Sequence, residues 1–116
     1  MDFKSEMNLS DLQYNQFVIY MRMLQEWNEK FNLTAITDCD GIILKHFIDS
    51  LTILKYLNNN EKVIDIGTGA GFPGIPVKIV NTTLNVTLMD SLNKRVNFLN
   101  EVIKALNLKE IEAVHA

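Results

Sequence analysis

Residues 63–74 read Val-Ile-Asp-Ile-Gly-Thr-Gly-Ala-Gly-Phe-Pro-Gly, an apolar run with one acid that passes into a glycine-rich segment. The apolar run predicts a strand, and the alternating glycines predict a tight loop whose backbone a ligand can approach closely. Proline is tolerated in the first turn of a helix, so Pro73 or Pro76 indicates that a helix follows. Nucleotide-like ligands bind at this first strand-to-helix turn of a doubly wound sheet. We therefore expect a site for an adenosine-containing cofactor.

The same alternation of strands and helices continues to the end of the sequence. Residues 62–66 are expected to form a central strand buried on both faces, and residues 85–89 a second strand that ends at Asp90. Ser91 is then expected to cap a helix, and residues 108–114 to begin a third strand. The order β-α-β-α-β requires right-handed crossovers and a parallel sheet. The expected fold class is α/β, with the first half of a Rossmann-like fold.

An amphipathic helical pattern precedes this half-fold. Ser10 and Gln13 have the spacing of a capping box. Apolar residues then recur at roughly helical spacing: Leu12, Phe17, Tyr20, Met21, Leu24, Trp27 and Phe31. After a connector over residues 32–40, a second helix is expected over residues 41–57, with an apolar face made of Ile43, Phe47, Leu51 and Leu54. We therefore divide the chain into an N-terminal helical region, residues 1–60, and the first half of a cofactor-binding domain, residues 61–116.

Rossmann-like sheets usually have about six strands, but this sequence stops within or just after its third expected strand. It is either a fragment of a longer protein or a degenerate minimal domain. We expect a fragment, because open edge strands are a liability for folding.

Composition and charge narrow the class of protein. The chain is 47% apolar and 22% charged, which is ordinary for a globular domain, and no apolar run reaches the length of a membrane span. The polar, acidic N-terminus does not resemble a signal peptide, and a single cysteine, Cys39, fits a reducing compartment. We expect a cytoplasmic protein that binds no membrane. A net charge of −3 gives no support to nucleic-acid binding.

Two cofactor classes fit the loop. Residues 69–74 match G-x-G-x-x-G, the dinucleotide fingerprint. However, Pro73 lacks an amide N–H for a pyrophosphate, and the acid Asp65 suits the ammonium group of S-adenosylmethionine better than a phosphate. Asp90 would accept hydrogen bonds from the ribose hydroxyls. The plainer alternatives are a structural carboxylate at Asp65, which caps a helix or orders the loop, and a solvated turn acid at Asp90. The expected cofactor-binding residues are Asp65, Gly67, Thr68, Gly69, Ala70, Gly71, Phe72, Asp90 and Ser91.

Four stretches together resemble one known family. They are Asp-Ile-Gly-Thr-Gly-Ala-Gly-Phe-Pro-Gly-Ile-Pro at residues 65–76, Leu-Met-Asp-Ser-Leu-Asn-Lys-Arg at 88–95, Trp-Asn-Glu-Lys-Phe-Asn-Leu-Thr-Ala-Ile at 27–36, and Lys-His-Phe-Ile-Asp-Ser-Leu at 45–51. The chain resembles ribosomal RNA small subunit methyltransferase G, also called the glucose-inhibited division protein B family. This resemblance implies a class I methyltransferase fold, S-adenosylmethionine as cofactor, and methyl transfer to guanine N7 of 16S ribosomal RNA or of the 30S subunit.

The resemblance also bears on catalysis. Guanine N7 has a free lone pair, so no catalytic base is needed, and we assign no certain catalytic residue; the enzyme must align the reactants. In the family, further strands and basic residues follow the position of Ala116, so an inactive chain is an open alternative. Two other functions stay open: an oxidoreductase that uses NAD or FAD, and a non-catalytic adenosine-binding or assembly module.

Several polar and aromatic residues have more than one interpretation. Asn32, His46 and Asp49 either lie at the mouth of the cofactor pocket, near the substrate, or pin the connector over residues 32–36. Lys94 and Arg95 could meet RNA phosphate, but a solvated surface is favoured. Trp27 and Phe31 could stack on a base, but core packing is favoured. The only histidines are His46 and His115, so no metal site is expected, and nothing indicates an obligate protein partner.

Overall fold

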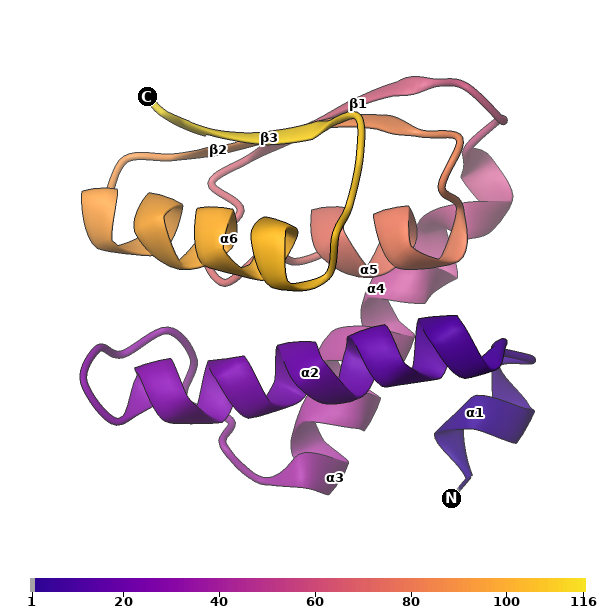
Figure 1. Cartoon of the computed structure of the whole chain (residues 1–116), viewed down its shortest axis with the longest axis horizontal. Helices are drawn as coiled ribbons and strands as arrows, with labels where there is room; N and C mark the ends of the chain where they lie inside the picture. Colours follow the sequence, from indigo (N-terminus) through magenta and orange to yellow (C-terminus); the bar gives the residue numbers. More distant parts are fainter. Residues whose placement is uncertain (1) are drawn as a thin grey trace.

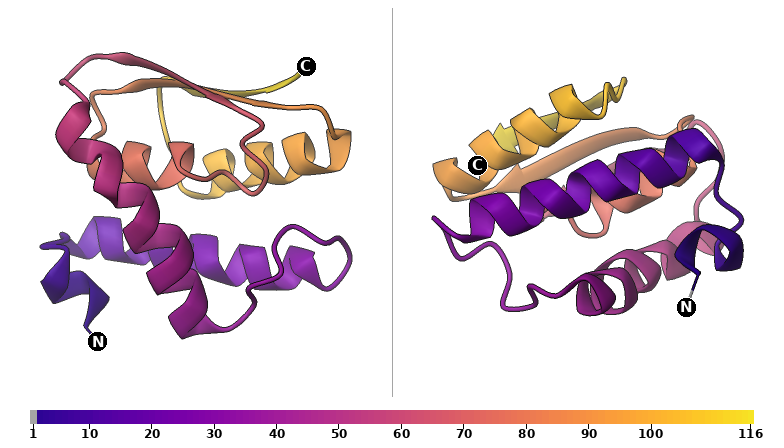
Figure 2. Two further views of the ribbon diagram at one scale, coloured as in Figure 1. Left: turned by 180° about the vertical axis from the view of Figure 1, so that it is seen from behind. Right: turned by 60° about the horizontal axis from the view of Figure 1, so that its bottom comes forward.

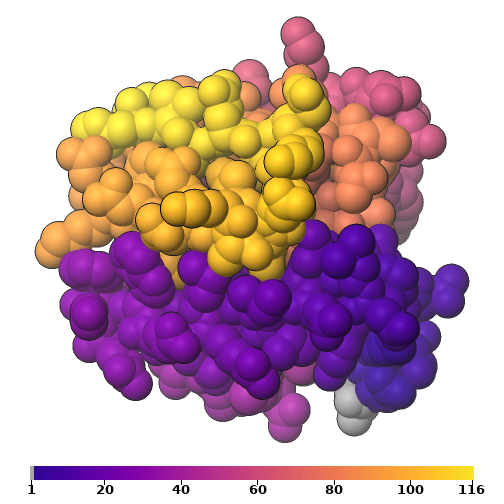
Figure 3. Space-filling model, in the orientation of Figure 1, coloured from indigo at the N-terminus to yellow at the C-terminus, as the bar shows by residue number. Residues whose placement is uncertain are grey.

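The structure is a computed structural model that describes residues 2–116, and its elements stack in layers (Figure 1). The sheet forms one layer, and α5 (Gly74–Val80) and α6 (Asn93–Ala105) pack against one of its faces. The helix α2 (Asp11–Asn28) packs on the other side of α5 and α6. Figure 3 shows how closely the N-terminal helices adjoin the part of the chain that contains the sheet. None of the helices in residues 2–116 is long and apolar enough to cross a membrane.

The sheet has the predicted parallel topology. Its strands are β1 (Lys62–Ile66), β2 (Asn85–Asp90) and β3 (Ile111–His115), in the spatial order β1-β2-β3. Asp65 pairs with Leu88, and Leu88 pairs with Ala113. The helices α5 and α6 connect these strands as crossovers. The α/β, Rossmann-like half-fold expected from the sequence is therefore confirmed.

The N-terminal part is helical, as expected. Besides α2 it contains α1 (Phe3–Glu6) and one continuous helical stretch made of α3 (Cys39–Gly41), the π-helix η1 (Ile42–Ile48), α4 (Asp49–Leu51) and the 3₁₀-helix η2 (Thr52–Tyr56). Seen from behind, this stretch runs across α2 and leads up to β1 (Figure 2). It therefore links the helical layer directly to the first strand.

The start of α2 confirms one prediction and corrects another. The Ser10–Gln13 capping box forms as expected, with the Gln13 amide N–H on Ser10 Oγ at 3.1 Å. Leu12, however, is 68% exposed and does not belong to the apolar face. Gln13 and Gln16 lie on the face that carries the buried Phe17, and their side chains donate to the carbonyls of Val80 and Leu106 in the layer above. The predicted apolar face of α2 is therefore confirmed from Phe17 onward, and only Leu12 was wrongly assigned to it.

The π-helical turn of η1 changes which residues are buried. The sequence predicts an apolar face through Ile43, but Ile42 is fully buried and Ile43 only partly. In a π-helix the hydrogen bonds join residues five apart, so Ile42 and Phe47 come to the same side. Both then belong to the hydrophobic core.

The prediction that β1 is buried on both faces is wrong for the chain as described. Ile64 is 63% exposed and Ile66 is 80% exposed, and β1 lies at an edge of the sheet. Both crossover helices lie on the opposite face, so within residues 2–116 no helix packs on the face that carries these isoleucines.

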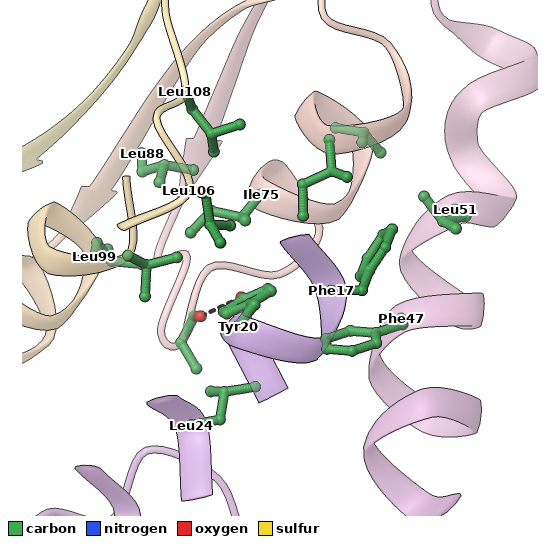
Figure 4. Close-up of a cluster of buried hydrophobic side chains, with 14 of the residues drawn as sticks. Phe17, Tyr20, Leu24, Phe47, Leu51, Ile75, Leu88, Leu99, Leu106 and Leu108 are labelled. Carbon is green, nitrogen blue, oxygen red and sulfur yellow. Dashed lines mark hydrogen bonds between the residues drawn. The ribbon is translucent and has the colours of Figure 1, made fainter. Parts of the chain in front are cut away.

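A single hydrophobic cluster joins the helical layer to the sheet (Figure 4). Phe17, Tyr20 and Leu24 of α2 enter it from one side, and Leu88 and Leu99 from the other. Phe98 of α6 is fully buried and packs its ring 5.4 Å from that of Trp27. The cause is that α6 lies between the sheet and α2, so it buries more than one face.

Candidate cofactor site

The glycine loop lies where the carboxyl ends of β1 and β2 meet. Gly67, Gly69 and Gly71 have φ angles of +70°, +61° and +103°. Only glycine adopts such angles at little cost, which explains the alternation of glycine in this segment. The amides of Gly67 and Thr68 donate to the carbonyl of Met89 at 2.8 and 3.0 Å, so the start of the loop is tied to β2.

The two sides of the loop differ in the space around them. A Cβ added at Gly67 or Gly69 would meet nothing within 4 Å. A Cβ at Gly71 would lie 2.6 Å from Tyr20 Oη, and one at Gly74 would lie 2.3 Å from a methyl carbon of Leu88. The backbone at Gly67 and Gly69 is therefore open to a ligand, whereas Gly71 and Gly74 are required by packing against the protein itself.

Asp65 holds the loop and the helix that follows it. Its Oδ2 accepts from Thr68 Oγ1 at 2.6 Å and from the Gly74 amide at 3.0 Å. Gly74 is the first residue of α5. Within residues 2–116 Asp65 Oδ1 accepts no hydrogen bond. Burial raises the pKa of this carboxyl above its usual value, although the hydrogen bonds from Thr68 and Gly74 act in the opposite direction. The structural role considered for Asp65 thus exists, and one oxygen remains for a ligand.

Asp90, at the end of β2, is 3% exposed and, like Asp65, holds backbone groups by hydrogen bonds. Its Oδ2 accepts from the Gly69 amide at 2.9 Å, and its Oδ1 accepts from the Leu92 amide at 3.0 Å. Arg95 Nη1 lies 3.5 Å from the same Oδ1. Burial alone would raise the pKa of Asp90, but the two amides and the arginine outweigh it and hold the pKa below its usual value. The alternative of a solvated turn acid is therefore wrong, while the ribose role stays a prediction.

Ser91 does not cap α6, contrary to the prediction. Leu92 occupies the N-cap position and makes no side-chain capping bond, and Ser91 is exposed. Asp90 instead orders the turn before α6 by accepting from the amide of Leu92, two residues on, as aspartate commonly does in turns. Ser91 instead contributes its carbonyl, which lies 3.0 Å from His115 Nε2.

His46 links the predicted connector to the loop. Its ring stacks on Phe72 with centroids 4.3 Å apart and an interplanar angle of 9°, and its Nε2 lies 2.7 Å from Thr34 Oγ1. The pinning interpretation therefore applies to His46, and the same residue also contacts the glycine loop. Asn32 and Asp49 are exposed, and no hydrogen bond or ion pair joins either side chain to the loop in residues 2–116. Their proposed place at the pocket mouth stays a prediction.

A groove lies away from the loop, between the end of α2 and the start of α6. Its volume is about 500 Å³, and it is lined by Glu26, Trp27, Glu29, Lys30, Phe31, Lys94 and Asn97. Lys94 Nζ lies 4.9 Å from the centre of the Phe31 ring, and Trp27 and Phe31 are both half-buried. Trp27 thus takes part in core packing as favoured, and Arg95 contacts Asp90 instead of lying free on the surface.

Two residues that contribute to the site were not singled out for it from the sequence. Tyr20 donates its hydroxyl to the Ala70 carbonyl at 2.5 Å, and Thr34 is the partner of His46. For Tyr20 a signal existed, since a tyrosine in an apolar helical stripe must find a partner for its hydroxyl. For Thr34 no local pattern pointed to His46. Among residues 2–116, no three His, Cys, Asp or Glu side chains gather as a metal-binding group.

Comparison with known proteins gives strong matches. The chain is 57% identical over 112 residues to a ribosomal RNA small subunit methyltransferase G of Clostridium botulinum (strain Alaska E43 / Type E3), covering 95% of this chain and 47% of that protein. It is 59% identical over 110 residues to the protein of the same name from Acetivibrio thermocellus, covering 94% of this chain and 46% of that protein. The chain spans about half the length of the curated relatives it matches.

A solved structure supports the fold. A SAM-dependent methyltransferase from Aquifex aeolicus aligns with a TM-score of 0.56 and 27% identity, over 79% of this chain and 46% of that chain. Residues 61–116 make up less than 79% of this chain, so the aligned part also includes some of the N-terminal helical region.

The family model named GidB, described as rRNA small subunit methyltransferase G, matches residues 13–116. This match includes the glycine loop, both strand-end acids and most of the helical layer. The chain therefore belongs to the GidB family, the rRNA small subunit methyltransferase G proteins.

Proposed function

We propose that this chain forms the S-adenosylmethionine-binding part of an enzyme that methylates guanine N7 of 16S ribosomal RNA, either in free RNA or in the 30S subunit. Family membership supports the reaction. The observation that carries the cofactor assignment is the open backbone at Gly67 and Gly69, which lies between the carboxylates of Asp65 and Asp90.

The groups around this backbone fit S-adenosylmethionine. Asp65 Oδ1 is free to accept from the ammonium group of the methionyl part, because Oδ2 alone holds Thr68 and Gly74. Asp90 already binds two amides, but a carboxylate has about four acceptor positions, so ribose hydroxyls can still find lone pairs there. Thr68, Ala70, Phe72 and Ser91 complete the proposed set as loop residues on either side of these acids.

The chain's own task in the reaction is to bind and to align. The cofactor supplies an activated methyl group on a positively charged sulfur. The loop and the two acids would hold the adenosyl and methionyl parts, so that the methyl carbon lies in line with N7 of the guanine. Asn32, His46 and Asp49 remain our candidates for the substrate side of the pocket. No proton must be removed, so no residue is assigned as a base.

The geometry disfavours the dinucleotide alternative. A pyrophosphate needs free amide donors at the N-terminus of the helix after the loop. Here the Gly74 amide donates to Asp65 and the Ile75 amide to the Gly71 carbonyl, while Pro76 has none. The relatives and the solved structure described above also carry methyltransferase names.

Calorimetric titration with S-adenosylmethionine, S-adenosylhomocysteine and NAD tests the cofactor assignment. We expect both adenosyl thioether compounds to bind and NAD not to bind. Asp65→Asn should weaken binding by at least tenfold, since hydrogen bonds to charged groups are worth about 1.5–3 kcal/mol. Asp40→Asn, which neutralises an exposed acid on α3, serves as the control. Tight binding of NAD alone would refute the proposal.

Methyl transfer from radiolabelled S-adenosylmethionine to 16S ribosomal RNA or 30S subunits tests the reaction. Transfer by this chain would exclude a non-catalytic adenosine-binding module. Binding without transfer would support the module for this chain. The proposed place of action is the cytoplasm, where 30S subunits are found. The division into residues 1–60 and 61–116 is likewise a proposal, because both parts share one hydrophobic cluster.

A further inference from the structure

One hydrogen bond joins the middle of α2 to the glycine loop. Tyr20 is fully buried, and its hydroxyl donates to the carbonyl of Ala70, 50 residues further along the chain, at 2.5 Å (Figure 4). Burial raises the pKa of this phenol well above its usual value, so the hydroxyl keeps its proton. The same oxygen occupies the position that a Cβ at Gly71 would need. Tyr20 therefore contacts the loop at two successive residues.

A second contact holds the next residue of the loop. The Phe72 ring lies between His46, at 4.3 Å and nearly parallel, and Tyr20, at 5.7 Å. His46 is itself held by Thr34 of the connector. Residues 70–72 are thus fixed from the helical layer by α2 and by η1, neither of which belongs to the half-fold that forms the loop.

Within residues 2–116, the opposite side of the loop has no such contacts with the helical layer. The positions at Gly67 and Gly69 have open space around them, and this is the side where the cofactor is proposed to lie. Glycine loses more conformational freedom on folding than any other residue, so a loop with three glycines at positive φ needs restraint from neighbouring structure. Functional loops keep their geometry when residues behind them lock their backbone.

We propose that Tyr20 and His46 are positioning residues of the cofactor site: from behind the loop, they fix the backbone conformation that Gly67 and Gly69 present to the ligand. The helical layer is then part of the cofactor site, although neither residue touches the ligand. Tyr20 acts through the Ala70 carbonyl, and His46 acts through the face of Phe72. This inference rests on the proposed function, because it takes the loop as the cofactor site.

Amide hydrogen exchange of the Tyr20→Phe chain tests the inference without any ligand. This change removes only the hydroxyl. The amides of Gly69, Gly71 and Phe72 are all hydrogen-bonded, so their exchange reports opening of the loop. We expect their exchange to accelerate about tenfold relative to Val86 and Leu88 in β2, which matches the loss of one net hydrogen bond. Tyr14→Phe, which removes the same atom from a half-exposed tyrosine of the same helix, should leave the exchange unchanged.

His46 is tested by rescue. His46→Ala removes the ring that faces Phe72, and it should accelerate exchange at Phe72 and Gly71. His46→Phe restores a flat ring without the bond to Thr34, and it should return exchange close to the wild-type rate. If loop and β2 amides accelerate equally in Tyr20→Phe, or if neither set changes, the inference is overturned, because the side chain then supports only the core.

Titration with S-adenosylhomocysteine separates this inference from the proposed function. We expect about tenfold weaker binding to Tyr20→Phe and unchanged binding to Tyr14→Phe. Equal affinity in a Tyr20→Phe chain whose loop opens would overturn the positioning role. If the wild-type chain binds no adenosyl compound, the proposed function fails, while the exchange rates still decide whether Tyr20 holds the loop.

Discussion

The two faces of the sheet are made of similar residues but have different surroundings. On the covered face, Val86 and Leu88 of β2 are fully buried under α5 and α6. On the other face, Ile64 and Ile66 of β1 are largely exposed. All four are aliphatic residues of adjacent parallel strands, so composition does not distinguish them. What distinguishes them is whether a helix of residues 2–116 lies against that face.

This difference carries over to function. The covered face leads directly to the site: Asp65 and Asp90 lie on it. In the helical layer beyond α5 and α6, Tyr20 of α2 and His46 of η1 contact the loop. Burial of polar groups there also has a free-energy cost. Asp90 and Lys78 are almost completely buried, so their side chains need hydrogen bonds with backbone groups. Both the hydrophobic core and the hydrogen-bonded, buried polar side chains therefore lie on the covered side of the sheet.

The largest difference in the free energy of unfolding is expected from truncating one aliphatic side chain on each face of the sheet. Leu88→Ala should lower the free energy of unfolding by about 2–5 kcal/mol, because it leaves a cavity against Gly74 and the core. Ile66→Ala should change it by only about 0.5 kcal/mol or less, as is usual at exposed positions. Urea unfolding followed by circular dichroism measures both. Similar losses in the two variants would mean that the exposed face is covered in solution.

A smaller effect is expected at Lys78 on α5. Its ammonium donates to the carbonyls of Thr82 and Leu84, and the residue is only 1% exposed. Burial lowers the pKa of this amine. Lys78→Met keeps the apolar stem but leaves buried carbonyls without a donor, so we expect a loss of about 1–3 kcal/mol in unfolding free energy. Lys109→Met, at an exposed position, should have almost no effect in the same assay.

The smallest effects on the free energy of unfolding are expected at Asp90 and Asp65, and their pH dependence has opposite signs. The pKa of Asp90 is lowered on folding, so its ionised form stabilises the protein above the ordinary value of 3.8, and this contribution is lost as the pH falls below it. Asp90→Asn should therefore cost about 1–2 kcal/mol at pH 7, and the difference from wild type should shrink below the ordinary pKa of 3.8.

At Asp65 the pKa is raised, so ionisation works against folding as the pH rises through it. Asp65→Asn should be as stable as wild type or more stable at pH 7, and the difference should disappear in acid. Unfolding curves between acid and neutral pH measure both variants. The same direction of pH dependence at both positions would contradict the environments described for them.

Much of this protein could be predicted from local patterns in its sequence. The glycine spacing of residues 67–71 required a loop with positive φ angles, and the capping box at Ser10 required a helix start. Strands and helices in the order β-α-β-α-β require right-handed crossovers, which predicted the parallel topology that the sheet has. The family followed from motifs of several residues each. All of these depend on neighbours in the chain, so a linear pattern contains them.

The remaining features depend on contacts between distant segments, which no linear pattern contains. The exposure of Ile64 and Ile66 depends on which elements pack on that face, and the apolar side of η1 shifted to Ile42 because a π-helical turn formed. Asp90 replaced Ser91 as the residue that orders the start of α6, because the end of β2 brings its carboxylate to the Leu92 amide. Only the tertiary structure brought Tyr20 to Ala70 and His46 to Phe72, and these contacts explain how a helical region can shape the cofactor loop.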